Sequence, residues 1–75
     1  MPPRPADLGP LDRLTSREIE VLKWAKEGKS AWEISLILHV SERTVKYHMG
    51  EIIARLHLDN RAQVIEYAKR TGLVR

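Results

Sequence analysis

Three times in a stretch free of proline, the chain places a helix-capping residue three positions before a Glu or a Gln. The stretch runs from Leu11 to Arg75. In such a pair, each side chain accepts a hydrogen bond from an amide that the first turn of a helix leaves free. The pairs are Thr15 with Glu18, Ser30 with Glu33, and Asn60 with Gln63. A signature repeated in this way predicts an all-α fold.

Glycines and apolar spacing set the helix boundaries. Gly28 and Gly72 stand where the first and last helices need a left-handed residue, and each follows a turn that contains Lys or Arg. In the third segment, Val45, Met49 and Ile52 fall on a narrow apolar stripe at helical spacing. We expect a four-helix bundle with helices at about residues 16–27, 31–38, 42–57 and 61–71.

Composition limits what a chain of 75 residues can do. All four prolines lie in the first ten residues, which predicts a flexible Pro-rich tail or linker at 1–13 and a folded domain at 14–75. The domain is too small for an enclosed catalytic cleft, and no cysteine is present, so we expect neither an enzyme nor a cofactor. No apolar run approaches the roughly 18 residues of a membrane span, which favours a cytoplasmic protein without membrane contact.

The three histidines do not form a metal site in this interpretation. His48 and His57 are nine residues apart on one expected helix, which places them on opposite faces, and His39 precedes that helix. No metal-binding motif accompanies them. We therefore expect no metal ion.

A short helix, a turn of about three residues and a longer helix with a basic amino-terminal face make a helix-turn-helix. The second helix of such a motif can enter the major groove of double-stranded DNA. Ser35 is small where the two helices would cross, and His39 occupies the turn position where glycine is frequent. Histidine tolerates a left-handed backbone better than most residues. The formal net charge of +3 is a mild excess that agrees with a polyanionic partner.

Four residues on the outward face of the expected third helix are candidates for reading DNA bases. Lys46 can donate to guanine, Tyr47 can offer a ring edge to a thymine methyl group or a hydroxyl to a phosphate, and Gly50 can allow a close approach. Arg43 is the fourth candidate. Each of them is alternatively an ordinary solvated residue, or in the case of Gly50 a tolerated helix glycine.

A second set lies near helix amino ends, where the helix dipole and free amides suit phosphate. The candidates for phosphate contact are Thr44, Lys29, Ser41, His48 and Arg61. The alternatives are caps or solvated charges, and His48 could instead contact the first helix.

The last helix carries an apolar arc that is wider than one core face requires. We assign Ile65 to the core and predict a weak homodimer contact, favoured on DNA, through Val64, Tyr67, Ala68 and Thr71. The isolated domain is expected to be mostly monomeric because the patch is small.

Several other side chains have structural interpretations. Glu18 is expected to serve as a capping partner that also pairs with a basic residue, and Trp24 to lie at the edge of the core. In the second helix, Ile34, Ile37 and Leu38 are expected to be buried. Trp32 and Leu36 lie on another side, where they either pack locally or dock to a missing sensory domain, RNA polymerase or another partner.

A set of residues in the stretch from 14 to 61 matches a known pattern in order and spacing, namely 14–18, 20–22, 28–30, 33–35, Leu38, 40–46, His48, Leu56 and 60–61. At these residues the chain resembles the LuxR-type (GerE-like) DNA-binding domain of bacterial transcription regulators. The resemblance implies a four-helix domain with the third helix as reader and the fourth as dimer contact. Gly50 stands where relatives often carry a basic or polar reading residue, and Arg55 replaces the usual Lys. Trp24 and residues 32–35 and 72–74 resemble most the branch that answers acyl-homoserine lactones in quorum sensing.

The function that follows is a sequence-specific transcription regulator that reads a pseudo-palindromic DNA site as a dimer. Two alternatives remain open. A sigma factor's region four also uses a helix-turn-helix, although it has little need of a fourth helix with its own apolar stripe. A protein-interaction module, such as an anti-activator, could retain the fold while sequestering a regulator.

Overall fold

The computed structural model describes residues 14–72, except for the side chain of Thr71. These residues form four α-helices: α2 (Ser16–Lys26), α3 (Ala31–Leu38), α4 (Glu42–Arg55) and α5 (Arg61–Thr71). The all-α, four-helix prediction is confirmed. The predicted tail at residues 1–13 lies outside the described residues. Within the described part, every helix is too short or too polar to span a bilayer.

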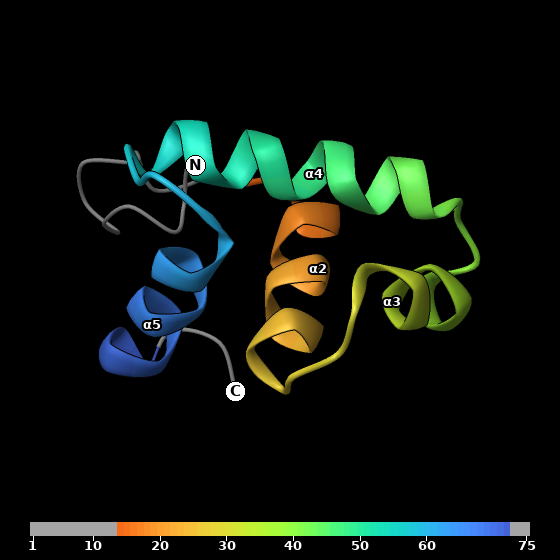
Figure 1. Ribbon diagram of the computed structural model, residues 1–75, viewed down its shortest axis with the longest axis horizontal. Helices are drawn as coiled ribbons and strands as arrows, with labels where there is room; N and C mark the ends of the chain where they lie inside the picture. Colours follow the sequence, from red (N-terminus) through yellow and green to blue (C-terminus); the bar gives the residue numbers. More distant parts are fainter. Residues whose placement is uncertain (1–13, 73–75) are drawn as a thin grey trace, which may run out of the picture.

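Helix α2 lies at the centre of the bundle. In Figure 1, α4 runs across one side of the molecule, while α3 and α5 flank α2 on opposite sides. Helix α2 packs against each of the other three. Its side chains Val21, Leu22 and Ala25 are almost completely buried. The position of α4 is therefore fixed mainly by the apolar face of α2 and by α3.

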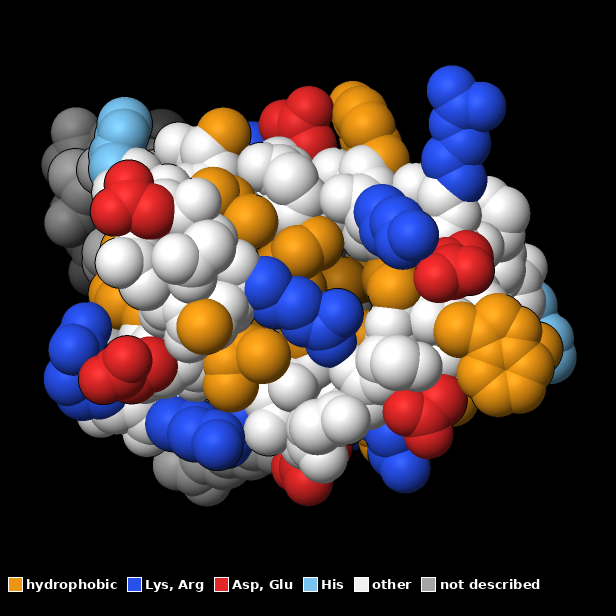
Figure 2. Space-filling view, viewed as in Figure 1, with side chains coloured by type: hydrophobic (Ala, Val, Ile, Leu, Met, Phe, Trp, Pro, Cys, Tyr) orange, Lys and Arg blue, Asp and Glu red, His pale blue; other side chains and the backbone are white. Residues whose placement is uncertain are grey.

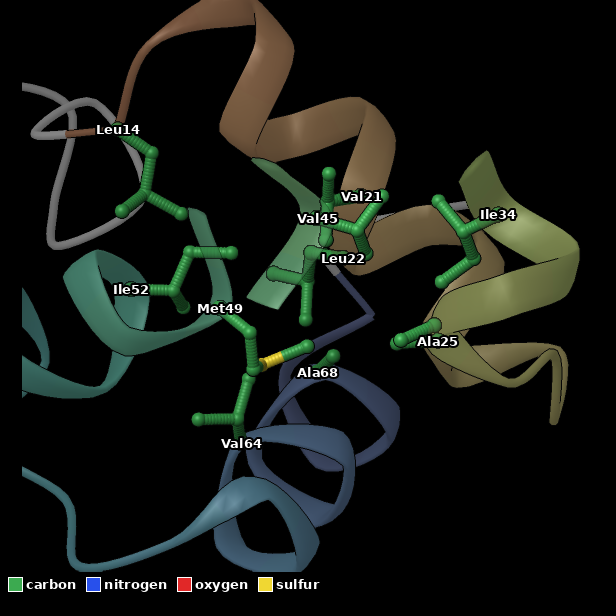
Figure 3. Close-up of a cluster of buried hydrophobic side chains, with 11 residues drawn as sticks. Leu14, Val21, Leu22, Ala25, Ile34, Val45, Met49, Ile52, Val64 and Ala68 are labelled. Carbon is green, nitrogen blue, oxygen red and sulfur yellow. The ribbon is translucent and has the colours of Figure 1, made fainter. Parts of the chain in front are cut away.

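The core is formed by one apolar cluster to which all four helices contribute. Figure 3 shows side chains from α2, α4 and α5 pointing toward a common centre, with Ile34 of α3 at one side. Burial of apolar side chains is the main stabilising contribution to such a bundle. The buried members are Leu14, Val21, Leu22, Ala25, Ala31, Ile34, Val45, Met49, Ile52, Val64 and Ala68.

Two of the three predicted capping boxes are complete. The Thr15 side chain accepts from the Glu18 amide at 3.1 Å, and the Glu18 carboxylate accepts from the Thr15 amide at 2.8 Å. Ser30 and Glu33 repeat this arrangement at 3.1 and 2.9 Å. Both pairs start their helices as the sequence predicts.

The third pair forms only half of a capping box. The Asn60 side chain accepts from the Gln63 amide at 3.0 Å. The Gln63 side chain, however, accepts from the amide of Asp59 at 2.7 Å. Helix α5 therefore begins at the expected residue with a different partner for Gln63.

Helix α4 ends two residues before the predicted boundary, at Arg55. His57 has a left-handed backbone, with φ of 55°. The His57 amide donates to the carbonyl of Ala54 at 3.2 Å, and the Leu58 amide donates to the carbonyl of Ile53 at 3.0 Å. These two bonds terminate the helix in the Schellman pattern. No glycine marks this end in the sequence, so the predicted end at residue 57 was two residues too late.

Two of the predicted dimer contacts belong to the core. Val64 and Ala68 have no exposed surface, because this face of α5 packs on α2. Neither side chain can touch a second subunit, which corrects the predicted contact. Ile65, which we assigned to the core, is partly buried against it, and Tyr67 is also partly buried. The side chain of Thr71 lies outside the described residues.

One face of α3 carries more exposed apolar surface than predicted. Ile34 is fully buried and Leu38 packs against the core as expected. Ile37 is 38% exposed, so the expectation that it is buried was wrong. Trp32 and Leu36 are 59% and 56% exposed. A helix of eight residues beside one edge of the bundle buries only a narrow stripe, and the rest faces outward.

Candidate nucleic-acid interface

A turn of three residues joins α3 to α4. His39 ends α3 with φ of 58°, which confirms the predicted left-handed residue, and the Val40 amide donates to the carbonyl of Ser35 at 3.1 Å. Ser35 itself is buried, and its hydroxyl donates to the carbonyl of Trp32 at 2.5 Å. The small buried side chain lets α3 and α4 approach each other closely. The resulting geometry is that of a helix-turn-helix.

Ser41 and Thr44 shape the amino end of α4. The Ser41 side chain accepts from the Thr44 amide at 3.0 Å, and the two hydroxyl oxygens are 2.9 Å apart. Both residues were predicted to contact phosphate. They form the helix cap, and they stand at the positive end of the helix dipole, where an anion is favoured.

One face of α4 is open to solvent. All four predicted base-reading residues are exposed, namely Arg43, Lys46, Tyr47 and Gly50. Figure 2 shows Lys and Arg side chains standing out from the amino-terminal half of this helix. Lys46 lies 3.5 Å from the carboxylate of Glu42 one turn earlier, and both side chains are well exposed. Such a pair is weak, so it does not prevent Lys46 from contacting another anion.

Among the described residues, Tyr47 is the most exposed large hydrophobic side chain, at 63%. Its ring meets the ring of His48 edge to face, with centroids 5.6 Å apart. A hydrogen bond with the Glu51 side chain, together with the charge of that carboxylate, raises the pKa of Tyr47 above its ordinary value of 10.0. The phenol is therefore neutral at physiological pH and can donate to Glu51. His48 is partly buried beside it.

Arg61 and Lys29, both predicted to contact phosphate, meet in the structure. The Arg61 guanidinium donates to the backbone carbonyl of Lys29 at 2.5 Å. This bond ties the amino end of α5 to the segment before α3. Sequence reasoning did not predict it, because the two residues are 32 positions apart and no local pattern links them.

A hollow of about 230 Å³ lies where α3, α4 and α5 meet. Its wall is mostly apolar and includes two residues of the open α4 face, Lys46 and Gly50, together with Arg61. The other lining residues are Ala31, Ile34, Val45, Met49 and Ile53. Sequence reasoning did not find the hollow, since its wall comes from three helices.

The histidines do not come together. Among the residues that the structure describes, no three side chains of the His, Cys, Asp or Glu type are grouped so that they could hold a metal ion. His39 and His57 both serve as left-handed residues at helix ends.

A helix-turn-helix with an exposed basic face defines a DNA-binding domain of the kind found in transcription regulators. The chain belongs to the luxR family of bacterial regulatory proteins, whose sequence profile matches residues 12–68. It is a DNA-binding domain of the transcription-regulator type and not an enzyme.

Individual relatives agree with the family. The HTH-type quorum sensing-dependent transcriptional regulator RpaR of Rhodopseudomonas palustris is 50% identical over 64 residues, which are 85% of this chain and 26% of that protein. The transcriptional activator LuxR of Aliivibrio fischeri is 51% identical over 61 residues, 81% of this chain and 24% of the relative. The regulatory protein SdiA of Escherichia coli is 42% identical over 60 residues, which are 80% of this chain and 25% of that protein. The chain spans about a quarter of the length of these curated relatives.

Proposed function

We propose that α4 enters the DNA major groove and that the chain reads a pseudo-palindromic site as a dimer. The observation that carries this proposal is the exposure of Arg43, Lys46, Tyr47 and Gly50 on one face of α4, directly after the three-residue turn. A helix presented in this way reaches base edges with its amino-terminal residues.

The residues of this face take different roles. Lys46 donates to a guanine at O6 or N7, and Arg43 reaches a neighbouring base or phosphate. Tyr47 contributes its ring edge to a thymine methyl group or its hydroxyl to a phosphate. Gly50 exposes bare backbone to the groove.

A second group holds the sugar-phosphate backbone. Ser41 and Thr44 present the amino end of α4 to one phosphate. His48, one helical turn after Thr44 and partly exposed, is a further phosphate contact. Lys29 and Arg61, joined by their hydrogen bond, present two cations to another phosphate. These contacts carry affinity and little sequence information.

The dimer contact is assigned to the outer side of α5 around Tyr67. Arg70 lies over the Tyr67 ring at 5.9 Å and leaves part of the phenol at the surface. So small a patch supports a dimer only when DNA holds two subunits on neighbouring half-sites. We therefore expect a monomer in free solution at micromolar concentration.

Quorum sensing is the setting that the relatives suggest for this domain. RpaR is named as quorum sensing-dependent. We infer that this chain is the DNA-binding part of a regulator of the same kind. Trp32 and Leu36 supply the exposed apolar surface for a protein partner, either RNA polymerase or a sensory domain.

Selection from a random DNA pool, followed by affinity measurements at several salt concentrations, tests the proposal. We expect enrichment of a pseudo-palindrome and a steep fall in affinity between about 50 and 200 mM salt. Affinity that does not change with salt would count against DNA as the ligand and in favour of an anti-activator that binds only protein.

A further inference from the structure

The hollow beside α4 is continuous with the face that we assign to DNA. Lys46 and Gly50 belong to both, and Arg61 brings a second cation to the rim. Behind them lie the apolar side chains of Val45, Met49 and Ile53. In the view of Figure 2, hydrophobic surface is exposed between α4 and α5, with basic side chains around it. A polyanion lying on this face would place its own apolar groups over the hollow.

Nothing in the fold requires a glycine at position 50. The glycines with positive φ are Gly28 and Gly72 among the described residues, so Gly50 has ordinary helical geometry. A Cβ built on Gly50 would meet no atom within 4 Å. Glycine weakens the interior of a helix compared with alanine. Packing within the domain therefore does not explain this residue, and a contact with the ligand is the alternative that we follow.

The major groove offers one apolar group on its base edges, the C5 methyl group of a pyrimidine. All other groups there are hydrogen-bond donors and acceptors, which an apolar wall does not satisfy. The bare backbone at Gly50 allows a base edge to approach more closely than any side chain would. Lys46, one turn earlier, can hold a neighbouring guanine at the same time.

We propose that Gly50 leaves the hollow open to the C5 methyl group of a pyrimidine, so that the base beside the Lys46 contact is read as thymine. The inference rests on the proposed function, because it needs α4 in the major groove. It adds one discriminating contact that hydrogen bonding alone does not supply.

The test uses the DNA site obtained by selection and replaces each thymine in turn by deoxyuridine, which lacks only the methyl group. At one position in each half-site we expect affinity to fall about four-fold, the value of one buried methyl group. Replacing that thymine by cytosine and then by 5-methylcytosine separates the methyl group from the thymine oxygen. The methylated cytosine should regain the four-fold factor.

Two variants tie the effect to the hollow. Gly50→Leu places a side chain across the opening of the hollow. The ratio between the affinities for the thymine site and the deoxyuridine site should then fall to one. Gly50→Ala, which the free space accommodates, should lower that ratio while keeping DNA binding measurable. Ala54→Leu is the matched control, since Ala54 is exposed one turn further along α4 and does not line the hollow. It should keep the ratio near four.

The outcomes are distinct. If the chain binds the selected DNA but no thymine shows a methyl effect, the inference is overturned and the proposed function stands. An unchanged ratio in Gly50→Leu also overturns it, because the methyl group would then be read elsewhere. Absence of sequence-specific binding by the unaltered chain would instead reject the proposed function.

Discussion

Arg55, the last residue of α4, forms an ion pair with Glu18, a buried residue of α2 that lies 37 positions earlier. The Glu18 carboxylate also accepts from the amide of Thr15. Arg55 in turn lies 3.8 Å from Glu51 on its own helix. One carboxylate therefore caps α2 and fixes the far end of α4, and the apolar-facing position of Glu18 is explained by both partners.

Removing Arg55 should destabilise the domain. Arg55→Ala leaves the buried Glu18 carboxylate without its cation, and we expect a loss of about 1–3 kcal/mol in the free energy of unfolding. Urea denaturation followed by tryptophan fluorescence measures it. Glu20→Ala is the control, because the Arg17–Glu20 pair is exposed and its loss should change stability by less than about 0.5 kcal/mol. Equal effects of the two substitutions would contradict a structural role for Arg55.

Substitution of two lysines should distinguish base recognition from phosphate contact. Lys46→Ala should cost about 1–3 kcal/mol on the selected site and little on random DNA. Lys29→Ala should weaken both DNAs similarly, and it leaves the backbone carbonyl that accepts from Arg61 unchanged. Titrations on both DNAs give the comparison. If Lys46→Ala lowers the affinity for the selected site and for random DNA equally, Lys46 contacts a phosphate rather than a base.

Within α5, core and contact residues should respond differently. Val64→Asp places a charge where no surface is exposed and should cost about 3 kcal/mol or more, enough to unfold a small domain. Circular dichroism would report this loss. Tyr67→Ala should leave the fold in place and reduce cooperative occupancy of a full palindrome, whereas the exposed control Lys69→Ala should change neither. A folded Tyr67→Ala variant with full cooperativity would exclude this contact.

The exposed apolar side chains of α3 should matter for a partner rather than for folding. Trp32→Ala and Leu36→Ala should change stability by less than about 1 kcal/mol, because more than half of each side chain is already exposed. DNA affinity should stay the same, while regulation of a reporter gene by a protein that carries this domain should weaken. Trp24→Ala should destabilise instead, since Trp24 packs against the core. Unchanged regulation by the Trp32 variant would exclude the proposed docking role.

The capping box of α3 should give an acid-dependent contribution to stability. Hydrogen bonds from the backbone and side chain of Ser30 lower the pKa of Glu33 below its ordinary value of 4.5. The charged form therefore favours the folded state: the contribution is complete above about pH 4.5 and is lost as pH falls through the lower, folded-state pKa. Carboxyl chemical shifts measured against pH should show a midpoint below 4.5. A midpoint at or above that value would contradict the cap in solution.

Local features of this fold were predictable from the sequence because their causes are local. A cap, a left-handed His39 and an apolar stripe each depend on residues within one or two turns. Which apolar residues of α5 face the core and which face outward was not predictable. Helical spacing identifies an apolar arc, but only the packing of α5 on α2 decides that Val64 and Ala68 face inward.

In the candidate interface, too, only features that depend on a single helix were predictable. The exposure of Lys46 and Tyr47 follows from one helix, and the sequence predicted it. The hydrogen bond of Arg61 with Lys29 and the hollow beside Gly50 each need several segments brought together. His57 ends α4 with a left-handed backbone, which histidine tolerates but which the presence of a histidine does not predict.

Both ends of α4 are held by other parts of the domain, by the turn from α3 at the start and by Glu18 at the end. If α4 enters DNA as we propose, a helix held in this way needs no slow rearrangement after the encounter. Encounter rates then differ little between DNA sequences, and the stability of the contacts sets how long each complex lasts. We expect this domain to distinguish its sites by residence time rather than by speed of arrival.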